Sequence, residues 1–134
     1  MKKVLCHGCF DLLHVGHVRH LQAAKAMGDW LVVSITADAF VNKGPGRPIH
    51  SLSERIEMVA ALSCVDEVIA SNYHTGFKSI VETMPDIFCK GVDYEAKVLN
   101  EAEVAACRAL GIAIKITNTK KYSTTEVIRK CASL

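Results

Sequence analysis

Residues 3–17 read KVLCHGCFDLLHVGH, and they combine a short apolar run, a turn and the start of a helix. The apolar run ends at Gly8, as a buried strand does, and apolar residues recur near helical spacing from Val15 onward. A strand that leads directly into a helix is the repeating unit of α/β proteins. The stretch therefore predicts the fold class of the chain.

The rest of the sequence repeats this alternation. Ser51 and Glu54 have the spacing of a capping box at a helix start, and Gly28 stands where the C-cap of the first helix is expected. The expected strands cover residues 3–7, 30–36, 67–70, 86–89 and 112–117, and the expected helices cover residues 15–27, 51–63, 76–83, 100–110 and 123–130. We expect a Rossmann-like, doubly wound sheet of about five parallel strands with helices on both faces.

Composition narrows the class of protein further. The chain has 134 residues, half of them apolar, and a formal net charge of +2, so a single domain over residues 1–134 is expected. The small charge argues against a nucleic-acid partner, and no apolar run approaches the roughly 18 residues of a membrane span. Of the six cysteines, Cys64, Cys89 and Cys107 lie within apolar patterns, which indicates free thiols in a cytoplasmic setting.

The strongest candidate site residues follow the first expected strand. Ligands of parallel sheets bind beyond the carboxyl ends of the strands. His14 and His17 share a helix face at positions i and i+3, and Gly16 between them leaves room for a close approach. A helix N-terminus suits phosphate, and imidazoles there can donate hydrogen bonds to it. The alternative is that one histidine caps the helix and the other is an ordinary polar residue.

Three further segments place candidate residues at the same predicted edge of the sheet. Lys43 and Arg55 offer cations for phosphate, although a solvated basic loop is the more common explanation of such a pattern. Asp93 could accept hydrogen bonds from ribose hydroxyls, or it could simply cap a turn. The last expected helix opens with three hydroxyl side chains, which form either a second phosphate site or a plain N-cap: Ser123, Thr124 and Thr125.

A zinc site is a competing hypothesis for the first segment. Cys6, Cys9, His14 and His17 are four possible ligands, but the gap between the pairs is shorter than in most zinc modules. Cys6 also lies within a predicted buried strand. We therefore expect no metal ligands from the protein itself.

Two motifs resemble the signatures of one family. GCFDLLHVGH at 8–17 and YSTTEVI at 122–128 are similar to the two signatures of the cytidylyltransferase-like nucleotidyltransferase superfamily, whose hallmark is HxGH. Three further segments resemble those of the heptose-1-phosphate adenylyltransferase branch: GRP at 46–48, VDEV at 65–68 and PDIFCKGVDY at 85–94. The next most similar branch is the glycerol-3-phosphate cytidylyltransferases, whose arginine before the second signature is missing from residues 118–121.

This resemblance implies a role for each candidate residue. His14 and His17 would contact the triphosphate and stabilise charge at the α-phosphorus. Lys43 would bridge the two substrates, and Arg55 would hold the second substrate's phosphate or the leaving pyrophosphate. The remaining residues would bind the nucleotide: Cys9, Phe10 and Gly16 in the cleft, Asp93 at the ribose with Lys90 and Gly91 nearby, and Ser123, Thr124 and Thr125 at the β- and γ-phosphates.

The implied activity is transfer of a nucleoside monophosphate, with release of pyrophosphate. The resemblance favours ATP and heptose 1-phosphate, with Mg²⁺ bound through the substrate phosphates, in a stand-alone homodimeric transferase. CTP with glycerol 3-phosphate is the first alternative, and flavin mononucleotide is a further acceptor. A non-catalytic nucleotide-binding module is an alternative of a different class.

Overall fold

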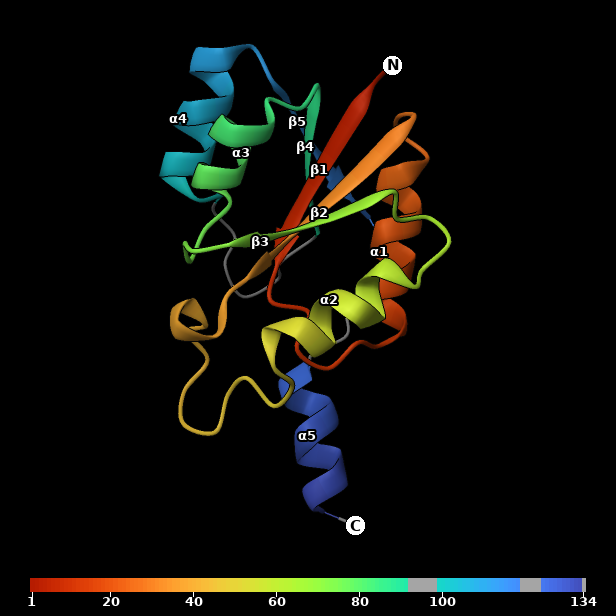
Figure 1. The fold of residues 1–134 in the computed structure, drawn as a ribbon, viewed down its shortest axis with the longest axis vertical. Coiled ribbons are helices and arrows are strands. Elements are labelled where there is room, and N and C mark those ends of the chain that lie inside the picture. The colour runs from red at the N-terminus through yellow and green to blue at the C-terminus, as the bar shows by residue number, and fades with distance from the viewer. Residues whose placement is uncertain (92–98, 119–123, 134) are drawn as a thin grey trace.

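The computed structural model describes residues 1–91, 99–118 and 124–133, with the backbone alone at 124–127. Strands and helices alternate along the chain as predicted (Figure 1). The elements are β1 (Lys3–Gly8), α1 (Val15–Lys25), β2 (Trp30–Thr36), the short 3₁₀ helix η1 (Asp38–Phe40), α2 (Leu52–Ala60), β3 (Glu67–Ser71), α3 (Phe77–Thr83), β4 (Ile87–Gly91), α4 (Glu101–Leu110), β5 (Ala113–Thr117) and α5 (Thr124–Ala132).

The five strands form one parallel sheet in the order β3-β2-β1-β4-β5. Helices α1 and α2 cover one face and α3 and α4 cover the other, so the sheet is doubly wound (Figure 1). The helices that connect β1, β2 and β3 lie on one face of the sheet, and the helices before and after β4 lie on the other. The change of face therefore falls between the neighbouring strands β1 and β4. In such sheets this is the point where a ligand finds a crevice at the carboxyl ends of the strands.

Side chains along β1 alternate between two apolar cores. Val4 and Cys6 point toward α1 and α2, whereas Leu5 packs with Ile80 and Phe88 beneath α3 and α4. Burial on both faces explains why the strands read as continuous apolar runs. The same burial confirms that Cys6 and other thiols act as small apolar core groups.

Gly28 differs from its predicted role. Helix α1 ends at Lys25 with Ala26 as its C-cap, so the glycine is not the capping residue. A Cβ at Gly28 would lie only 2.7 Å from Val4 Cγ2 and 2.8 Å from the Lys2 carbonyl oxygen. The position therefore requires glycine because the chain between α1 and β2 crosses closely over the start of β1.

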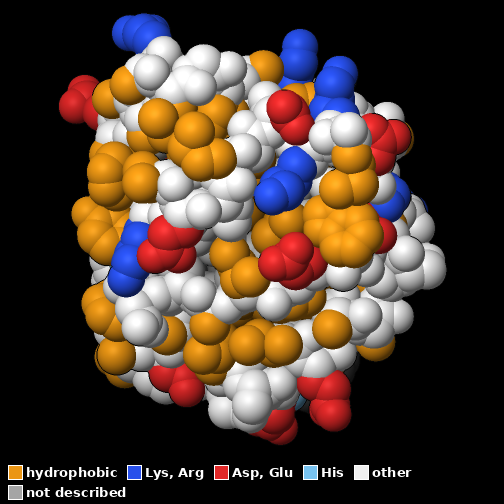
Figure 2. Space-filling view, turned by 45° about the horizontal axis from the view of Figure 1, so that its top comes forward, with side chains coloured by type: hydrophobic (Ala, Val, Ile, Leu, Met, Phe, Trp, Pro, Cys, Tyr) orange, Lys and Arg blue, Asp and Glu red, His pale blue; other side chains and the backbone are white. Residues whose placement is uncertain are grey.

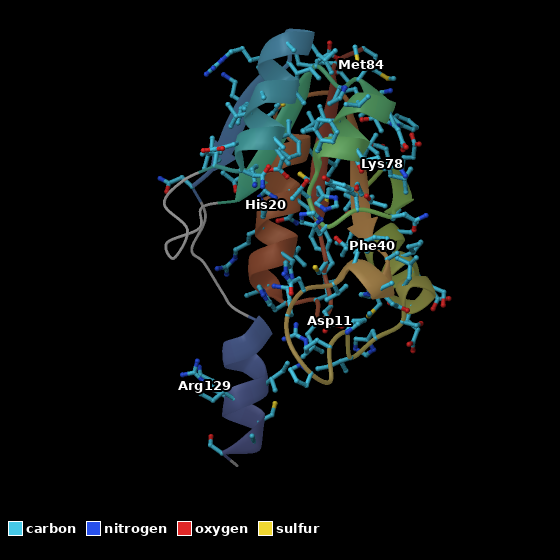
Figure 3. All side chains as sticks on the ribbon, turned by 90° about the vertical axis from the view of Figure 1, so that its left-hand side faces the viewer. Asp11, His20, Phe40, Lys78, Met84 and Arg129 are labelled. Atoms are coloured by element: carbon cyan, nitrogen blue, oxygen red, sulfur yellow. The ribbon has the colours of Figure 1, made fainter. Side chains whose placement is uncertain are left out.

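The carboxyl edge of the sheet is the end of the molecule nearest α5. Asp11 lies there beside the 41–50 loop, and Met84 lies at the opposite end (Figure 3). Helix α5 extends away beyond this edge (Figures 1 and 3). On the face drawn in Figure 2, acidic and basic side chains are interspersed with apolar ones. Within the described ranges, no helix is long and apolar enough to cross a membrane.

Candidate active site

His14 and His17 build the start of α1 from their own side chains. His14 is the N-cap, and its Nδ1 accepts a hydrogen bond from the Gly16 N–H at 3.1 Å. The His14 N–H donates in turn to Nδ1 of His17 at 3.2 Å, which completes a capping box. Because both Nδ1 atoms accept backbone protons, each neutral ring carries its own proton on Nε2. The two histidines can therefore cap the helix through Nδ1 and still donate to a ligand through Nε2.

Both rings are held in the neutral form. The pKa of His17 is lowered to about 3, chiefly by burial and also by the charges of His14, His20 and Lys43. Burial also lowers the pKa of His14. The two rings stack with centroids 3.8 Å apart, a geometry that two imidazolium ions would oppose. At neutral pH the pair consists of fixed donors rather than cations.

Phe10 fixes the turn between β1 and α1. Its backbone is left-handed, with φ at 50°, and its buried ring lies 5.2 Å from that of His17. Gly8 is needed beneath it, because a Cβ there would lie 2.9 Å from the Phe10 ring. The Phe10 side chain is therefore a core group. A nucleotide contact at this position would therefore fall to the backbone atoms of Phe10.

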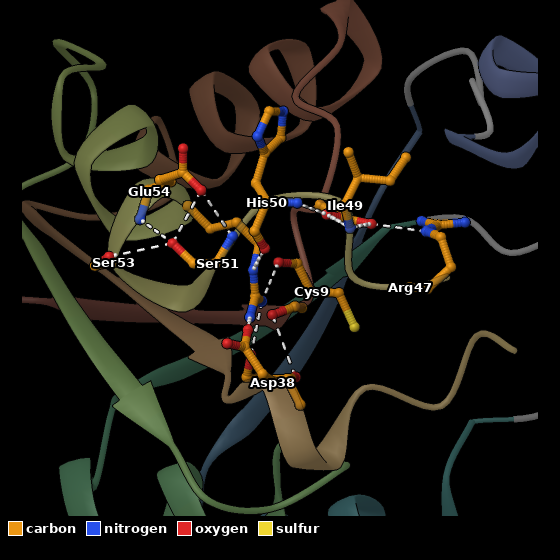
Figure 4. A network of polar contacts seen from close by, with 12 residues as sticks. Cys9, Asp38, Arg47, Ile49, His50, Ser51, Ser53 and Glu54 are labelled. Carbon is orange, nitrogen blue, oxygen red and sulfur yellow. Dashed lines mark hydrogen bonds and ion pairs between the residues drawn. The ribbon is translucent and has the colours of Figure 1, made fainter. Parts of the chain in front are cut away.

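Arg55 is buried and bonded within the protein, so its geometry gives no support to the predicted contact with a substrate phosphate. Its side chain is fully buried and makes four bonds, whose partners include Cys9, Asp38 and His50, labelled in Figure 4. Nε donates to the carbonyl of His50 at 3.1 Å, and Nη1 donates to the carbonyls of Cys9 at 2.9 Å and Thr36 at 2.7 Å. Nη2 pairs with Asp38 at 2.5 Å. Arg55 thus joins the ends of β1 and β2 to α2.

Asp11 is a central residue that the sequence analysis missed. Its buried carboxylate accepts the backbone N–H groups of Ile49 at 2.9 Å and His50 at 3.0 Å. Nε of Arg47 donates to it at 2.7 Å. Burial acts to raise the pKa of Asp11, but these donors outweigh burial and the net pKa lies below its usual value. Asp11 lies 36 residues before Arg47 and 39 residues before His50 in the sequence. No pattern of spacing indicates that residues so far apart are in contact.

Lys43 lies on the loop after β2, and Lys90 lies in β4. Lys43 is exposed on the 41–50 loop, and its charge contributes to the lowered pKa of His17. Lys90, in β4, donates to the buried Glu103 carboxylate at 2.6 Å. The other oxygen of Glu103 accepts the N–H of Gly76. Lys90 is therefore held toward α4, while Lys43 remains available to a ligand.

Two further histidines lie at the same edge, and the sequence analysis gave them no role. His7 shares a hydrogen bond of 2.7 Å with the hydroxyl of Ser34, and burial lowers its pKa to about 4. His20 shares a 2.6 Å hydrogen bond with Thr117, and Gly91 lies close to its ring. The available signal for His20 was the recurrence of histidine every three residues, at positions 14, 17 and 20.

The remaining predicted residues have no described side chains. Asp93 and Ser123 lie outside the described residues. Thr124 and Thr125 begin α5, of which only the backbone is described at these positions. As for zinc, Cys6 is buried in the core, and no group of three or more metal-ligating side chains occurs in residues 1–91, 99–118 and 128–133.

Comparison with known proteins then identifies the family. The family model described as cytidylyltransferase-like matches residues 5–130. The chain belongs to this family. The membership confirms the predicted class of nucleotidyltransferase and agrees with the phosphate-suited geometry at the start of α1.

Several relatives are similar over nearly the whole chain. Bifunctional protein HldE of Chromohalobacter salexigens is 41% identical over 128 residues, which are 93% of this chain and 26% of the relative. HldE of Citrifermentans bemidjiense is 41% identical over 134 residues, or 98% of this chain and 27% of the relative. The chain thus spans about a quarter of the length of these curated relatives.

Solved structures support the same fold. The lipopolysaccharide core biosynthesis protein from Thermoplasma volcanium has a TM-score of 0.74 and 33% identity, covering 92% of this chain and 99% of that one. Pantothenate synthetase from Thermus thermophilus has a TM-score of 0.60 and 14% identity, covering 94% and 58% respectively. The second likeness shows a shared fold alone.

Proposed function

We propose that the protein transfers the nucleoside monophosphate of ATP to a sugar phosphate, heptose 1-phosphate in the first instance, and releases pyrophosphate. The observation that carries this proposal is the capped pair of neutral histidines at the N-terminus of α1. The similarity to HldE and to a lipopolysaccharide core biosynthesis protein supports the choice of a sugar phosphate.

The reaction needs positioning and charge stabilisation more than a base. A phosphate monoester is already an anionic nucleophile, so one of its oxygens can attack the α-phosphorus in line. The bond from the α-phosphorus to the bridging oxygen breaks, and pyrophosphate leaves with the electron pair. His17 donates from Nε2 toward the phosphate oxygens as charge develops, the positive end of the α1 dipole acts in the same direction, and Lys43 adds a mobile cation.

Magnesium fits this site as part of the substrate, in the form of a Mg–nucleotide complex. Asp11 is the buried carboxylate nearest in sequence to His14, and its oxygens already accept three donor groups. No metal-ligating cluster occurs among the described residues. Phosphate oxygens, which are hard ligands that Mg²⁺ prefers, would therefore hold the ion in place of protein side chains.

A matrix of substrates tests this function. ATP and CTP, each with Mg²⁺, are incubated with heptose 1-phosphate, glycerol 3-phosphate or flavin mononucleotide, and pyrophosphate release is measured. We expect the highest kcat/KM for ATP with heptose 1-phosphate and no release without an acceptor. Release only with CTP and glycerol 3-phosphate would replace the proposed substrates. Nucleotide binding without release in any combination would instead identify a binding module.

A further inference from the structure

Arg47 carries a buried nitrogen that nothing in the described structure satisfies. Its side chain is only 9% exposed, and its Nε donates to Asp11 Oδ2 at 2.7 Å. Its Nη2 is shielded from solvent and has no hydrogen-bond partner among the described residues. A buried donor of a charged group is costly when it is left unbonded, so this nitrogen indicates a missing acceptor. An anion supplies the most favourable acceptor for a guanidinium.

The location of Arg47 connects it with the reacting groups. Its partner Asp11 belongs to the turn that leads into His14, three residues further on. Figure 4 shows Arg47 pointing away from Asp38, the acidic partner of Arg55. Arg55 already uses four of its five N–H donors on protein oxygens, and each of its nitrogens has a partner. Of these two arginines, Arg47 is the one with a whole buried nitrogen that has no partner among the described residues.

The strand order indicates which substrate this donor faces. The crevice for the nucleotide lies between the ends of β1 and β4, where the connections change face of the sheet. Arg47 belongs to the loop that follows β2, on the other side of β1. A ligand held by Arg47 thus approaches the histidines from the β2 side. This is the side left for the second substrate.

We propose that Arg47, oriented by Asp11, binds the phosphate monoester of the acceptor. The proposal rests on the proposed function. It gives Arg47 the contact with the acceptor phosphate that the family resemblance implied for Arg55. Asp11 holds Nε and so directs the remaining guanidinium donors outward from the pair. Gly44 and Gly46 lie in the exposed part of the same loop, where a Cβ would meet nothing within 4 Å.

Arg47→Gln separates ligand binding from loop structure. In this variant Asp11 still accepts the backbone N–H groups of Ile49 and His50, so the loop stays attached. We expect the KM for the sugar phosphate to rise about 10-fold or more, with the KM for the nucleotide nearly unchanged. The matched control is Arg108→Gln, an exposed arginine on α4, which should leave both values unchanged. A rise in the nucleotide KM alone, or no change in either KM, overturns the proposal.

A binding measurement makes the test independent of turnover. The Nε–H signal of Arg47 in an NMR spectrum is assigned by its loss in Arg47→Gln and followed during titration with inorganic phosphate. We expect this signal to shift in the natural protein and the phosphate affinity to fall in the variant. A signal that does not respond, together with equal affinities, overturns the proposal. If phosphate binding depends on Arg47 but no substrate pair yields pyrophosphate, the anion site stands and the proposed function fails.

Discussion

His14 and His17 combine a structural task with a chemical one. By accepting backbone protons at Nδ1, the rings close the first turn of α1 and also fix where their own protons lie. Burial then keeps the His17 ring neutral, with a pKa of about 3. A donor that is already oriented and needs no change of protonation loses little free energy when charge develops on a substrate.

Replacing His17 tests this role. His17→Ala removes a donor aimed at the developing charge, so we expect kcat to fall about 10²–10³-fold. The helix also loses part of its capping box, so thermal unfolding should be measured beside turnover. His74→Ala, at an exposed histidine, is the control and should retain full turnover. Near-natural turnover in folded His17→Ala would contradict the assignment.

Arg55 gives the opposite expectation. Arg55→Ala leaves three carbonyl oxygens without their buried donor, and each such loss costs about 1–3 kcal/mol, so we expect the free energy of unfolding to fall by about 3 kcal/mol or more. Urea unfolding measures this loss, with the exposed Arg108→Ala as the control. A variant of natural stability with a raised acceptor KM would instead support the substrate contact predicted from the sequence.

At the scale of elements, local signals predicted where most segments begin. Ser51 and Glu54 form the expected capping box, with the Glu54 N–H donating to Ser51 at 3.3 Å. Helix ends were less accurate: α2 stops at Ala60 although the pattern continued to residue 63. The apolar residues beyond Ala60 still pack on the core, so periodicity alone does not mark where the helical backbone ends.

Gly28 provides a prediction for the packing of α1 against β1. Gly28→Ala places a Cβ against backbone at Lys2 and the side chain of Val4, so we expect a loss of about 1–3 kcal/mol. Chemical denaturation measures it. Gly91→Ala is the comparison, because a Cβ there meets only ordinary contacts, the nearest at 3.7 Å. Equal stability of the two variants would show that the chain near Gly28 relaxes easily.

For the whole molecule, the order of elements along the chain was enough to predict a doubly wound parallel sheet. It did not determine the contacts between loops, because those depend on distances across the folded sheet. Asp11 and Arg47 are the clearest example: both were visible, and only the fold brings them together. Arg55 is the reverse case, since a cation after a basic loop suggested phosphate while the fold buries it.

The stability of the whole chain should depend on pH through two partly buried histidines. Burial lowers the pKa of His7 to about 4 and that of His17 to about 3, so both rings bind protons more readily when unfolded. Stability is therefore complete above about pH 6.5 and falls as the pH drops toward these values, by about 1.4 kcal/mol per pH unit for each proton. Urea unfolding across this range measures the slope. His7→Asn should reduce it, and an unchanged slope would exclude His7 as a source.

The exposed thiol of Cys131 offers a site for a fluorescent label without any substitution in the chain. Cys6, Cys89 and Cys107 are enclosed in the core, and Cys9 and Cys64 are half-buried, whereas Cys131 is exposed on α5. A maleimide dye used in limiting amount reacts first where access is greatest. Because α5 extends beyond the carboxyl edge of the sheet, a dye at Cys131 would record by fluorescence whether this helix changes position when substrates arrive.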